Sequence, residues 1–98
     1  MKRALVTGGS GGIGAAICRR LAADGCHVIV HANRGRDKAA AVVGEILAGG
    51  GSAEAIIFDV TEREPTATVL ADLLAAGPIQ ILVNNAGIHA DAVFPGMS

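Results

Sequence analysis

Aromatic residues are nearly absent from this chain: Phe58 and Phe94 are the only two, and there is no Trp or Tyr. A hydrophobic core must therefore come from Ala, Val, Ile and Leu, a mixture that suits helices packed on a buried parallel sheet. Charged residues make up only 17% of the chain, and the net charge is −1. Disorder needs low hydrophobicity and high charge, so a chain that is 51% hydrophobic is expected to fold.

Long apolar runs and basic clusters are missing as well. No apolar run approaches the length of a membrane span, and the run from Ala4 passes at once into glycines, unlike a signal peptide. We therefore expect a cytoplasmic protein. Without a basic stripe there is no electrostatic case for binding nucleic acid or an anionic membrane. The 98 residues suffice for one small domain.

Cysteines are scarce, with only Cys18 and Cys26 in the chain. In a reducing compartment we expect both to be small core residues and not a disulfide. The neighbours His27 and His31 suggest a metal site, but alternation along a strand would place them on the face opposite Cys26. A fourth ligand is lacking, so no metal site is predicted.

Short apolar runs alternate with helical periodicity along the chain. Strands are predicted over residues 4–7, 27–32, 53–58 and 79–83. Helices are predicted between them: one with an apolar face at Ile13, Ala16, Ile17 and Leu21, one over 36–48, and one that ends at Gly77-Pro78. Thr61 and Glu64 have capping-box spacing at the start of the last helix.

This alternation predicts an α/β fold, a Rossmann-like doubly wound parallel sheet. The chain would supply its first half, with four strands in the order 3-2-1-4 and three helices. Ligands of such a sheet bind at the carboxyl ends of the strands, where the strand order reverses. The glycines after the first strand and the Asn-Asn-Ala-Gly segment after the fourth are both predicted to border that crevice.

The run TGGSGGIG, residues 7–14, joins the first strand to the first helix. Glycines there permit a tight turn, close approach of the backbone to a diphosphate, and close packing of the helix on the strand. The diphosphate would lie on the amides and partial positive charge of the helix N-terminus. Two glycine spacings overlap: Gly9, Gly11, Gly14 and Gly8, Gly12, Gly14. A merely flexible connection is the alternative, and the lack of a following Lys-Ser/Thr excludes a P-loop.

Three segments together resemble the short-chain dehydrogenase/reductase family, and within it the 3-oxoacyl-[acyl-carrier-protein] reductases. They are ALVTGGSGGIGAAI at 4–17, FDV at 58–60 and LVNNAGI at 82–88. The likeness covers the whole chain as the amino-terminal part of such a reductase.

The resemblance implies a role in nucleotide binding for each segment. The diphosphate and ribose cradle would be formed by Gly8, Ser10, Gly12, Ile13 and Gly14. The adenine ring would contact Asp59 and Val60, with capping or solvation of Asp59 as the alternative. The adenine ribose would be walled by Asn84, Asn85, Ala86 and Gly87, which would also hold the fourth strand in place.

Cofactor choice depends on the end of the second strand. An NAD site places Asp or Glu about 20 residues past the glycines, whereas a 2′-phosphate calls for Arg. Here the strand runs into Asn33 and Arg34, with no acid before Asp37. We predict NADP(H), with Arg34 paired to the 2′-phosphate and Asn33 donating a hydrogen bond. The alternative is that Arg34 is a solvated loop charge, and Gly11 stands where NADP-dependent relatives often carry a basic residue.

The family's reaction moves a hydride from the nicotinamide to a carbonyl, using Ser, Tyr and Lys. The chain has no Tyr, so no catalytic residue is predicted in it, and all three are expected beyond Ser98. We expect an inactive NADP(H)-binding portion of a tetrameric reductase that acts on 3-oxoacyl groups carried by acyl-carrier protein in fatty-acid synthesis. The alternatives are another short-chain reductase, for a small ketone, polyketide or sugar, or a non-catalytic or degenerate nucleotide-binding module.

Overall fold

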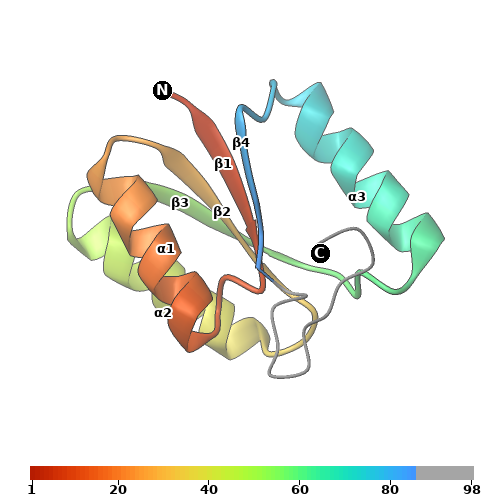
Figure 1. The fold of residues 1–98 in the computed structure, drawn as a ribbon, viewed down its shortest axis with the longest axis horizontal. Coiled ribbons are helices and arrows are strands. Elements are labelled where there is room, and N and C mark those ends of the chain that lie inside the picture. The colour runs from red at the N-terminus through yellow and green to blue at the C-terminus, as the bar shows by residue number, and fades with distance from the viewer. Residues whose placement is uncertain (86–98) are drawn as a thin grey trace, which may run out of the picture.

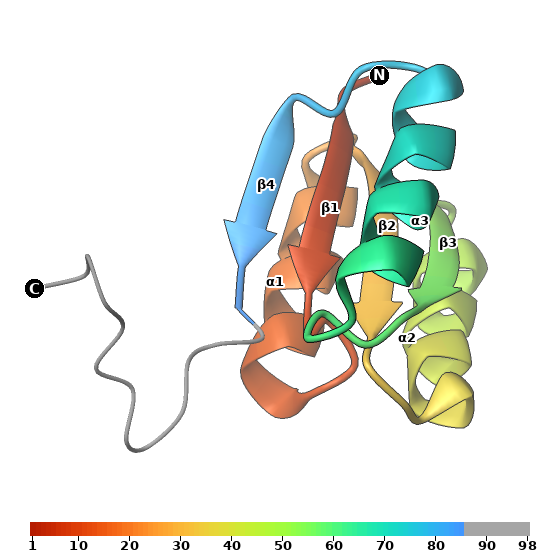
Figure 2. The ribbon, with the colours of Figure 1, turned by 90° about the vertical axis from the view of Figure 1, so that its right-hand side faces the viewer.

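A four-stranded sheet forms the centre of the computed structural model, which describes residues 1–85. The strands are β1 (Arg3–Thr7), β2 (His27–Ala32), β3 (Ser52–Ile57) and β4 (Ile81–Asn84). They are all parallel and lie in the order β3-β2-β1-β4, so their carboxyl ends meet at one edge (Figure 2). This confirms the strand order predicted from the sequence.

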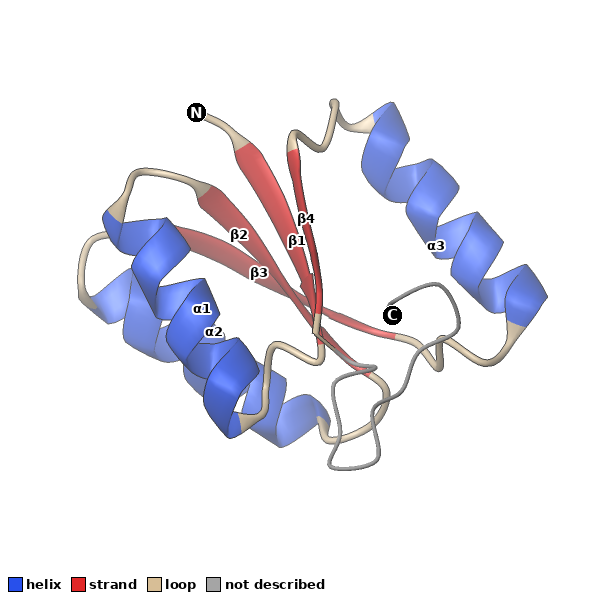
Figure 3. Ribbon diagram, in the orientation of Figure 1, coloured by secondary structure: helices blue, strands red, loops and turns tan. Residues whose placement is uncertain are grey.

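Three helices cover the sheet on both faces. They are α1 (Gly12–Ala23), α2 (Arg36–Ala48) and α3 (Arg63–Ala75). The helices α1 and α2 lie on one face and α3 lies alone on the other (Figures 1 and 3). The chain thus forms the three-layer arrangement of a doubly wound sheet.

Alternation along the strands divides the core into two clusters. On β1, Ala4 and Val6 belong to the larger cluster, while Leu5 belongs to the smaller one. The larger cluster packs the sheet against α1 and α2, and it includes Cys18 and Cys26. Both cysteines are buried and free, as predicted, and burial raises the pKa of the Cys18 thiol to about 11.

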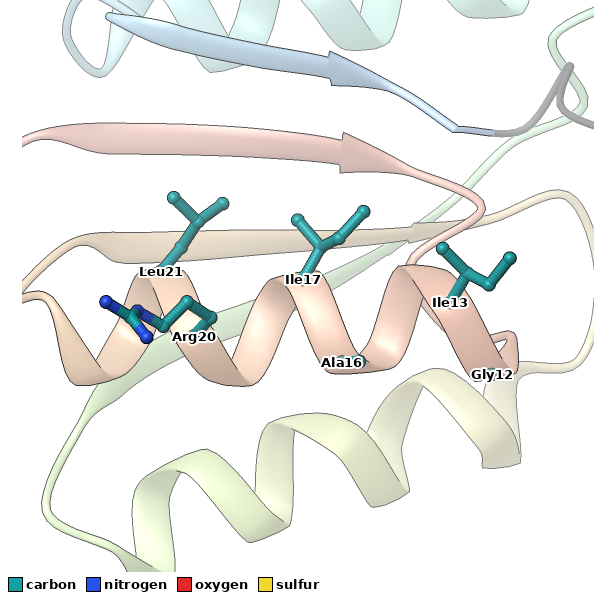
Figure 4. A pocket seen from close by; sticks show the side chains of 6 residues that line it. All are labelled: Gly12, Ile13, Ala16, Ile17, Arg20 and Leu21. Carbon is teal, nitrogen blue, oxygen red and sulfur yellow. The ribbon is translucent and has the colours of Figure 1, made fainter.

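The face of α1 that packs on the sheet differs in part from the predicted one. The buried residues of the helix are Gly14, Ala15 and Cys18, all small. Of the predicted apolar face, Ile17 and Leu21 are half-buried and pack against the larger core cluster, whereas Ile13 is 66% exposed. An open groove runs along this face, lined by Gly12, Ile13, Ala16, Ile17, Arg20 and Leu21 (Figure 4). Small residues occupy the most buried positions of α1 because they let the helix axis approach the strands closely.

The start of α3 also departs from the sequence prediction. The N-cap is Glu62, and its side chain makes no capping bond, so the predicted capping box of Thr61 and Glu64 is wrong. In the structure Thr61 lies before the N-cap, and its hydroxyl donates to a carboxylate oxygen of Asp59 at 2.7 Å.

We expect Leu73→Ala to loosen α3, because Leu73 is the buried residue through which this helix joins Leu5 and Ile29. The free energy of unfolding, measured by urea denaturation, should fall by about 2 to 5 kcal/mol. The matched control is Leu74→Ala, since Leu74 is 56% exposed against 6% for Leu73, and its effect should stay within about 0.5 kcal/mol. Equal losses in the two variants would contradict this account of how α3 is held.

Candidate functional site

The predicted site residues within the described part of the chain gather at the carboxyl edge of the sheet. The glycine loop follows β1, Asn33 and Arg34 follow β2, and Asp59 and Val60 lie just beyond β3. On the fourth strand, Asn84 is the last residue of β4, and Asn85 comes next. The sheet order therefore brings four separate stretches of sequence to one edge. The predicted residues Ala86 and Gly87 lie outside the described residues.

Gly8 begins the loop with a left-handed backbone, at φ 64°. Its N–H donates to Nδ1 of His31 at 3.0 Å, and its carbonyl accepts from the Asn85 side-chain amide at 3.0 Å. The same carbonyl accepts from the N–H of Gly11 at 3.3 Å. A glycine suits this position because other residues rarely adopt a positive φ.

Gly9 and Gly14 are required for a different reason, namely close packing. A Cβ on Gly14 would collide with the carbonyl of Gly8 and lie 2.6 Å from the side-chain nitrogen of Asn85. A Cβ on Gly9 would lie 2.9 Å from the sulfur of Cys18. Gly12 is the opposite case, because the space above it is open at the exposed N-terminus of α1. Glycines from both spacings are therefore needed in the structure: Gly9 belongs to one, Gly8 to the other, and Gly14 to both.

The first-turn amides of α1 belong to Gly12, Ile13 and Gly14. The first helical bond is made by the N–H of Ala15 to the carbonyl of Gly11, at 2.6 Å. Amides before that point have no acceptor within the helix, so they can bind an anion, which the helix dipole also favours. Ser10 is half-buried in the loop that leads to them.

The ends of β1 and β4 are joined side by side. Thr7 pairs with Asn84 in the sheet register, and its hydroxyl accepts from the N–H of Asn85 at 2.9 Å. Asn85 thereby holds the end of β1 through its backbone and the glycine loop through its side chain. These bonds fix the fourth strand relative to the loop.

The ends of β2 and β3 are joined in a similar way. Asn33 accepts at its side-chain oxygen from the N–H of Val60, at 3.4 Å. The carboxylate of Asp59 accepts from the hydroxyl and N–H of Thr61, and these two bonds hold the pKa of Asp59 below its usual value. The positive charge of Arg34 lowers it further, which places the guanidinium within electrostatic reach of this corner. Asp59 thus organises the turn before α3, and at neutral pH it is ionised.

Sequence reasoning missed two residues of this edge, His31 and Phe58. The Nε2–H of His31 donates to the carbonyl of Phe58 at 2.7 Å, and the two rings lie 4.2 Å apart. Strand alternation predicts the face of the sheet on which His31 lies. It does not indicate the hydrogen-bond partners of the ring, Gly8 and Phe58, which lie 23 and 27 residues away in the chain.

The residues considered for a metal site have separate partners in the structure. Cys26 lies in the larger core cluster, whereas His27 bonds to Ser52 and Glu54 on the neighbouring strand. Over residues 1–85, no three His, Cys, Asp or Glu side chains are grouped so that they could hold a metal ion. In that same range, the helices are too short or too polar to span a bilayer.

The family model of the short chain dehydrogenases matches residues 2–98 of the chain. The chain belongs to the short chain dehydrogenase family. Its glycine loop and its FDV and NNAG segments all lie within the matched residues.

Several relatives of this short chain dehydrogenase are longer proteins. The chain is 47% identical over 96 residues to the uncharacterized oxidoreductase YuxG of Bacillus subtilis, covering 95% of the chain and 14% of YuxG. It is 42% identical over 91 residues to the 3-oxoacyl-[acyl-carrier-protein] reductase FabG of Staphylococcus epidermidis, covering 92% and 37%. The chain therefore spans well under half the length of these relatives.

A solved structure confirms the fold. The crystal structure of a metagenomic short-chain oxidoreductase in complex with NADP superposes with a TM-score of 0.84 and 42% sequence identity. The match covers 89% of this chain and 39% of that one. The parallel sheet described here therefore has the same fold as the corresponding part of that NADP-bound oxidoreductase.

We expect Gly14→Ala to disrupt the loop, because the added methyl group would displace the Gly8 carbonyl and the Asn85 amide. The unfolding free energy in urea should fall by about 1 to 3 kcal/mol. Gly44→Ala is the matched control, since Gly44 is a glycine inside α2 with open space around it. That substitution should raise stability by up to about 1 kcal/mol. A Gly14→Ala protein as stable as the control would show that the loop is not packed as described.

Proposed function

We propose that residues 1–98 form the NADP(H)-binding, Rossmann-type portion of a short-chain carbonyl reductase. The observation that carries the proposal is the convergence of the glycine loop, Asn33 with Arg34, Asp59 with Val60, and Asn84 with Asn85 at one sheet edge. Each stretch follows a different parallel strand, and this edge is where doubly wound sheets bind nucleotides. The NADP complex of the metagenomic relative supports the choice of ligand.

The chain fits a diphosphate at the start of α1. The open space above Gly12 lets an anion reach the backbone, and the first-turn amides have no acceptor within the helix, so they can donate to it. The hydrogen bonds at the N–H and the carbonyl of Gly8 hold the start of the loop in place. We assign the diphosphate and neighbouring ribose to this cradle, formed by Gly8, Ser10, Gly12, Ile13 and Gly14.

The adenosine end would lie across the strands next to the cradle. Val60 is 40% exposed and offers an apolar surface to the adenine ring, while the ionised Asp59 can accept from the exocyclic amine. Asn84 and Asn85, with Ala86 and Gly87 after them, would wall the adenine ribose. We assign the 2′-phosphate to Arg34, because a guanidinium binds phosphate through paired, charge-assisted bonds.

Bound NADPH would supply a hydride to a carbonyl carbon. The residues of this chain would bind and orient the cofactor, and the proton donor would come from another part of the protein, since the chain has no Tyr. We propose a 3-oxoacyl thioester as the substrate, by analogy with the FabG relative, in a cytoplasmic homotetramer that receives the acyl group from acyl-carrier protein. A small ketone, polyketide or sugar substrate is the competing proposal within the family.

A non-catalytic dinucleotide-binding module is the second candidate function. The residues assigned above bind and orient the cofactor, and none of them is assigned a role in proton transfer. Cofactor oxidation by the complete protein with an acetoacetyl thioester would separate the two. Turnover supports the reductase, and tight NADPH binding without turnover on any carbonyl supports the module.

We expect Arg34→Ala to weaken NADP(H) binding by about tenfold to a hundredfold while changing NAD(H) binding little. The physical reason is that only NADP(H) carries the 2′-phosphate, and a charge-assisted bond to a phosphate contributes about 1.5 to 3 kcal/mol. Dissociation constants for both cofactors, measured by fluorescence or calorimetric titration of the complete protein, give the result.

Arg20→Ala is the control for loss of one positive charge. Arg20 lies in the last turn of α1, where it pairs with Asp24 at 3.3 Å, away from the carboxyl edge. Its removal should leave both dissociation constants within about twofold, because exposed ion pairs contribute little. Retention of the full NADP preference by Arg34→Ala would refute the phosphate assignment.

A further inference from the structure

His31 is the one polar side chain among the buried residues in the described part of the chain, with an exposed fraction of 0%. It lies on β2, next to β1 in the sheet, and near the carboxyl edge where the cofactor is proposed to bind. Burying an imidazole is unfavourable unless both ring nitrogens find partners. Both ring nitrogens of His31 are therefore expected to have hydrogen-bond partners inside the protein.

Both nitrogens of His31 are engaged, and their partners determine the proton position. Nδ1 accepts from the N–H of Gly8 at 3.0 Å, because a backbone amide can only donate. Nε2 lies 2.7 Å from the carbonyl oxygen of Phe58, which can only accept. The ring must therefore be neutral, with its single proton on Nε2.

The bond to Gly8 places His31 at the start of the glycine loop. Gly8 is the first loop residue after β1, its φ is 64°, and its carbonyl is held from the other side by Asn85. A second bond, from the N–H of Gly9 to the backbone carbonyl of His31 at 2.8 Å, ties the loop to the same strand. The conformation of Gly8 thus depends on one side chain from β2, at its N–H, and on one that follows β4, at its carbonyl.

We propose that His31 is a positioning residue for dinucleotide binding: its neutral imidazole holds the Gly8 peptide so that the glycine loop keeps its cradle open. The inference rests on the proposed function, since it concerns the same cradle. His31 touches no atom of the cofactor in this account. It acts through Gly8 on one side and through Phe58, which precedes the Asp59–Val60 pair, on the other.

Protonation would break this arrangement. A second proton on Nδ1 would face the Gly8 N–H, so one donor would point at another and the loop bond would be lost. Burial lowers the pKa of His31, while the Phe58 carbonyl and the negative charge of Asp59 oppose that effect in part. Asp59 is itself stabilised as an anion by Thr61 and by the charge of Arg34, so these are the charged groups that act on the ring from the neighbouring segments.

The sign of the pH effect follows from this lowered pKa. The unfolded chain takes up a proton near pH 6.5, but the folded chain does not until a lower pH. The stabilisation from the neutral ring is therefore complete above pH 6.5. It is lost progressively as the pH falls from 6.5 towards the pKa of the folded protein.

Two conservative variants separate the two bonds of the ring. His31→Asn places an amide oxygen near the position of Nδ1 and can keep the bond from Gly8. His31→Gln places its amide near Nε2 and can keep the bond to Phe58 instead. Each variant loses one hydrogen bond, so a merely structural role predicts equal loss of stability and equal cofactor affinity.

We expect the complete protein with His31→Asn to bind NADPH within about threefold of the wild type at pH 7.5. With His31→Gln, the dissociation constant should rise about tenfold, as one lost orienting hydrogen bond would produce. In addition, the stability of wild type relative to His31→Asn should fall between pH 7.5 and pH 5.5. Measuring this difference without cofactor keeps the titration of the 2′-phosphate, whose pKa is about 6, out of the comparison.

A spectroscopic measurement tests the proposal without any variant. Nitrogen NMR of the wild-type protein labelled at histidine should show His31 protonated at Nε2 and unprotonated at Nδ1 at pH 7.5. A ring protonated at Nδ1, equal NADPH affinities for the Asn and Gln variants, or a pH-independent stability difference would each overturn the role of His31. Failure of the proposed function is distinguishable, because wild type itself would then not bind NADPH, and the inference would fall with it.

Discussion

Gly8 donates its N–H to a side chain from β2 and accepts at its carbonyl from the residue that follows β4. These are the two strands that flank β1 in the sheet, so the two consecutive peptide groups that meet at Gly8 link the end of β1 to β2 and to the residue after β4. The left-handed φ of Gly8 turns the chain sharply out of β1 and towards α1. The direction of α1, and with it the direction of its first-turn amides, depends on how Gly8 is held.

Close packing imposes the second constraint on the site. The helix α1 meets the sheet through Gly14, Ala15 and Cys18, and a methyl group added at Gly14 has no room beside the Gly8 carbonyl. The larger aliphatic side chains of α1 lie beside this contact: Ile17 and Leu21 are half-buried against the core, and Ile13 is exposed (Figure 4). A helix that must bring its first amides close to a loop thus has a buried face of small residues, not of large ones.

The sequence alone was enough to predict the layers, the parallel strands, their order and the edge at which the site lies. Apolar runs and glycines carry that information locally, and the chirality of crossovers supplies the rest. What periodicity could not supply was the depth of packing, which is why Ile13 was expected on the buried face of α1. It also could not supply contacts between strands, because the bonds of His31 depend on the register of β1, β2 and β3. The cap of α3 was missed for a similar reason, since the helix begins after Glu62, and the contact of Thr61 with Asp59 depends on the turn that follows β3.

The separation of Gly8 and Asn85, 77 positions along the chain, has a consequence for synthesis. At the usual speed of translation, roughly 4 to 15 seconds pass between the two residues. During that time β1 can pair with β2, but β4 does not yet exist, so the contacts of the loop with His31 can form before those with Asn85. The nucleotide cradle proposed here would therefore be completed last, once the final strand described here has been synthesised.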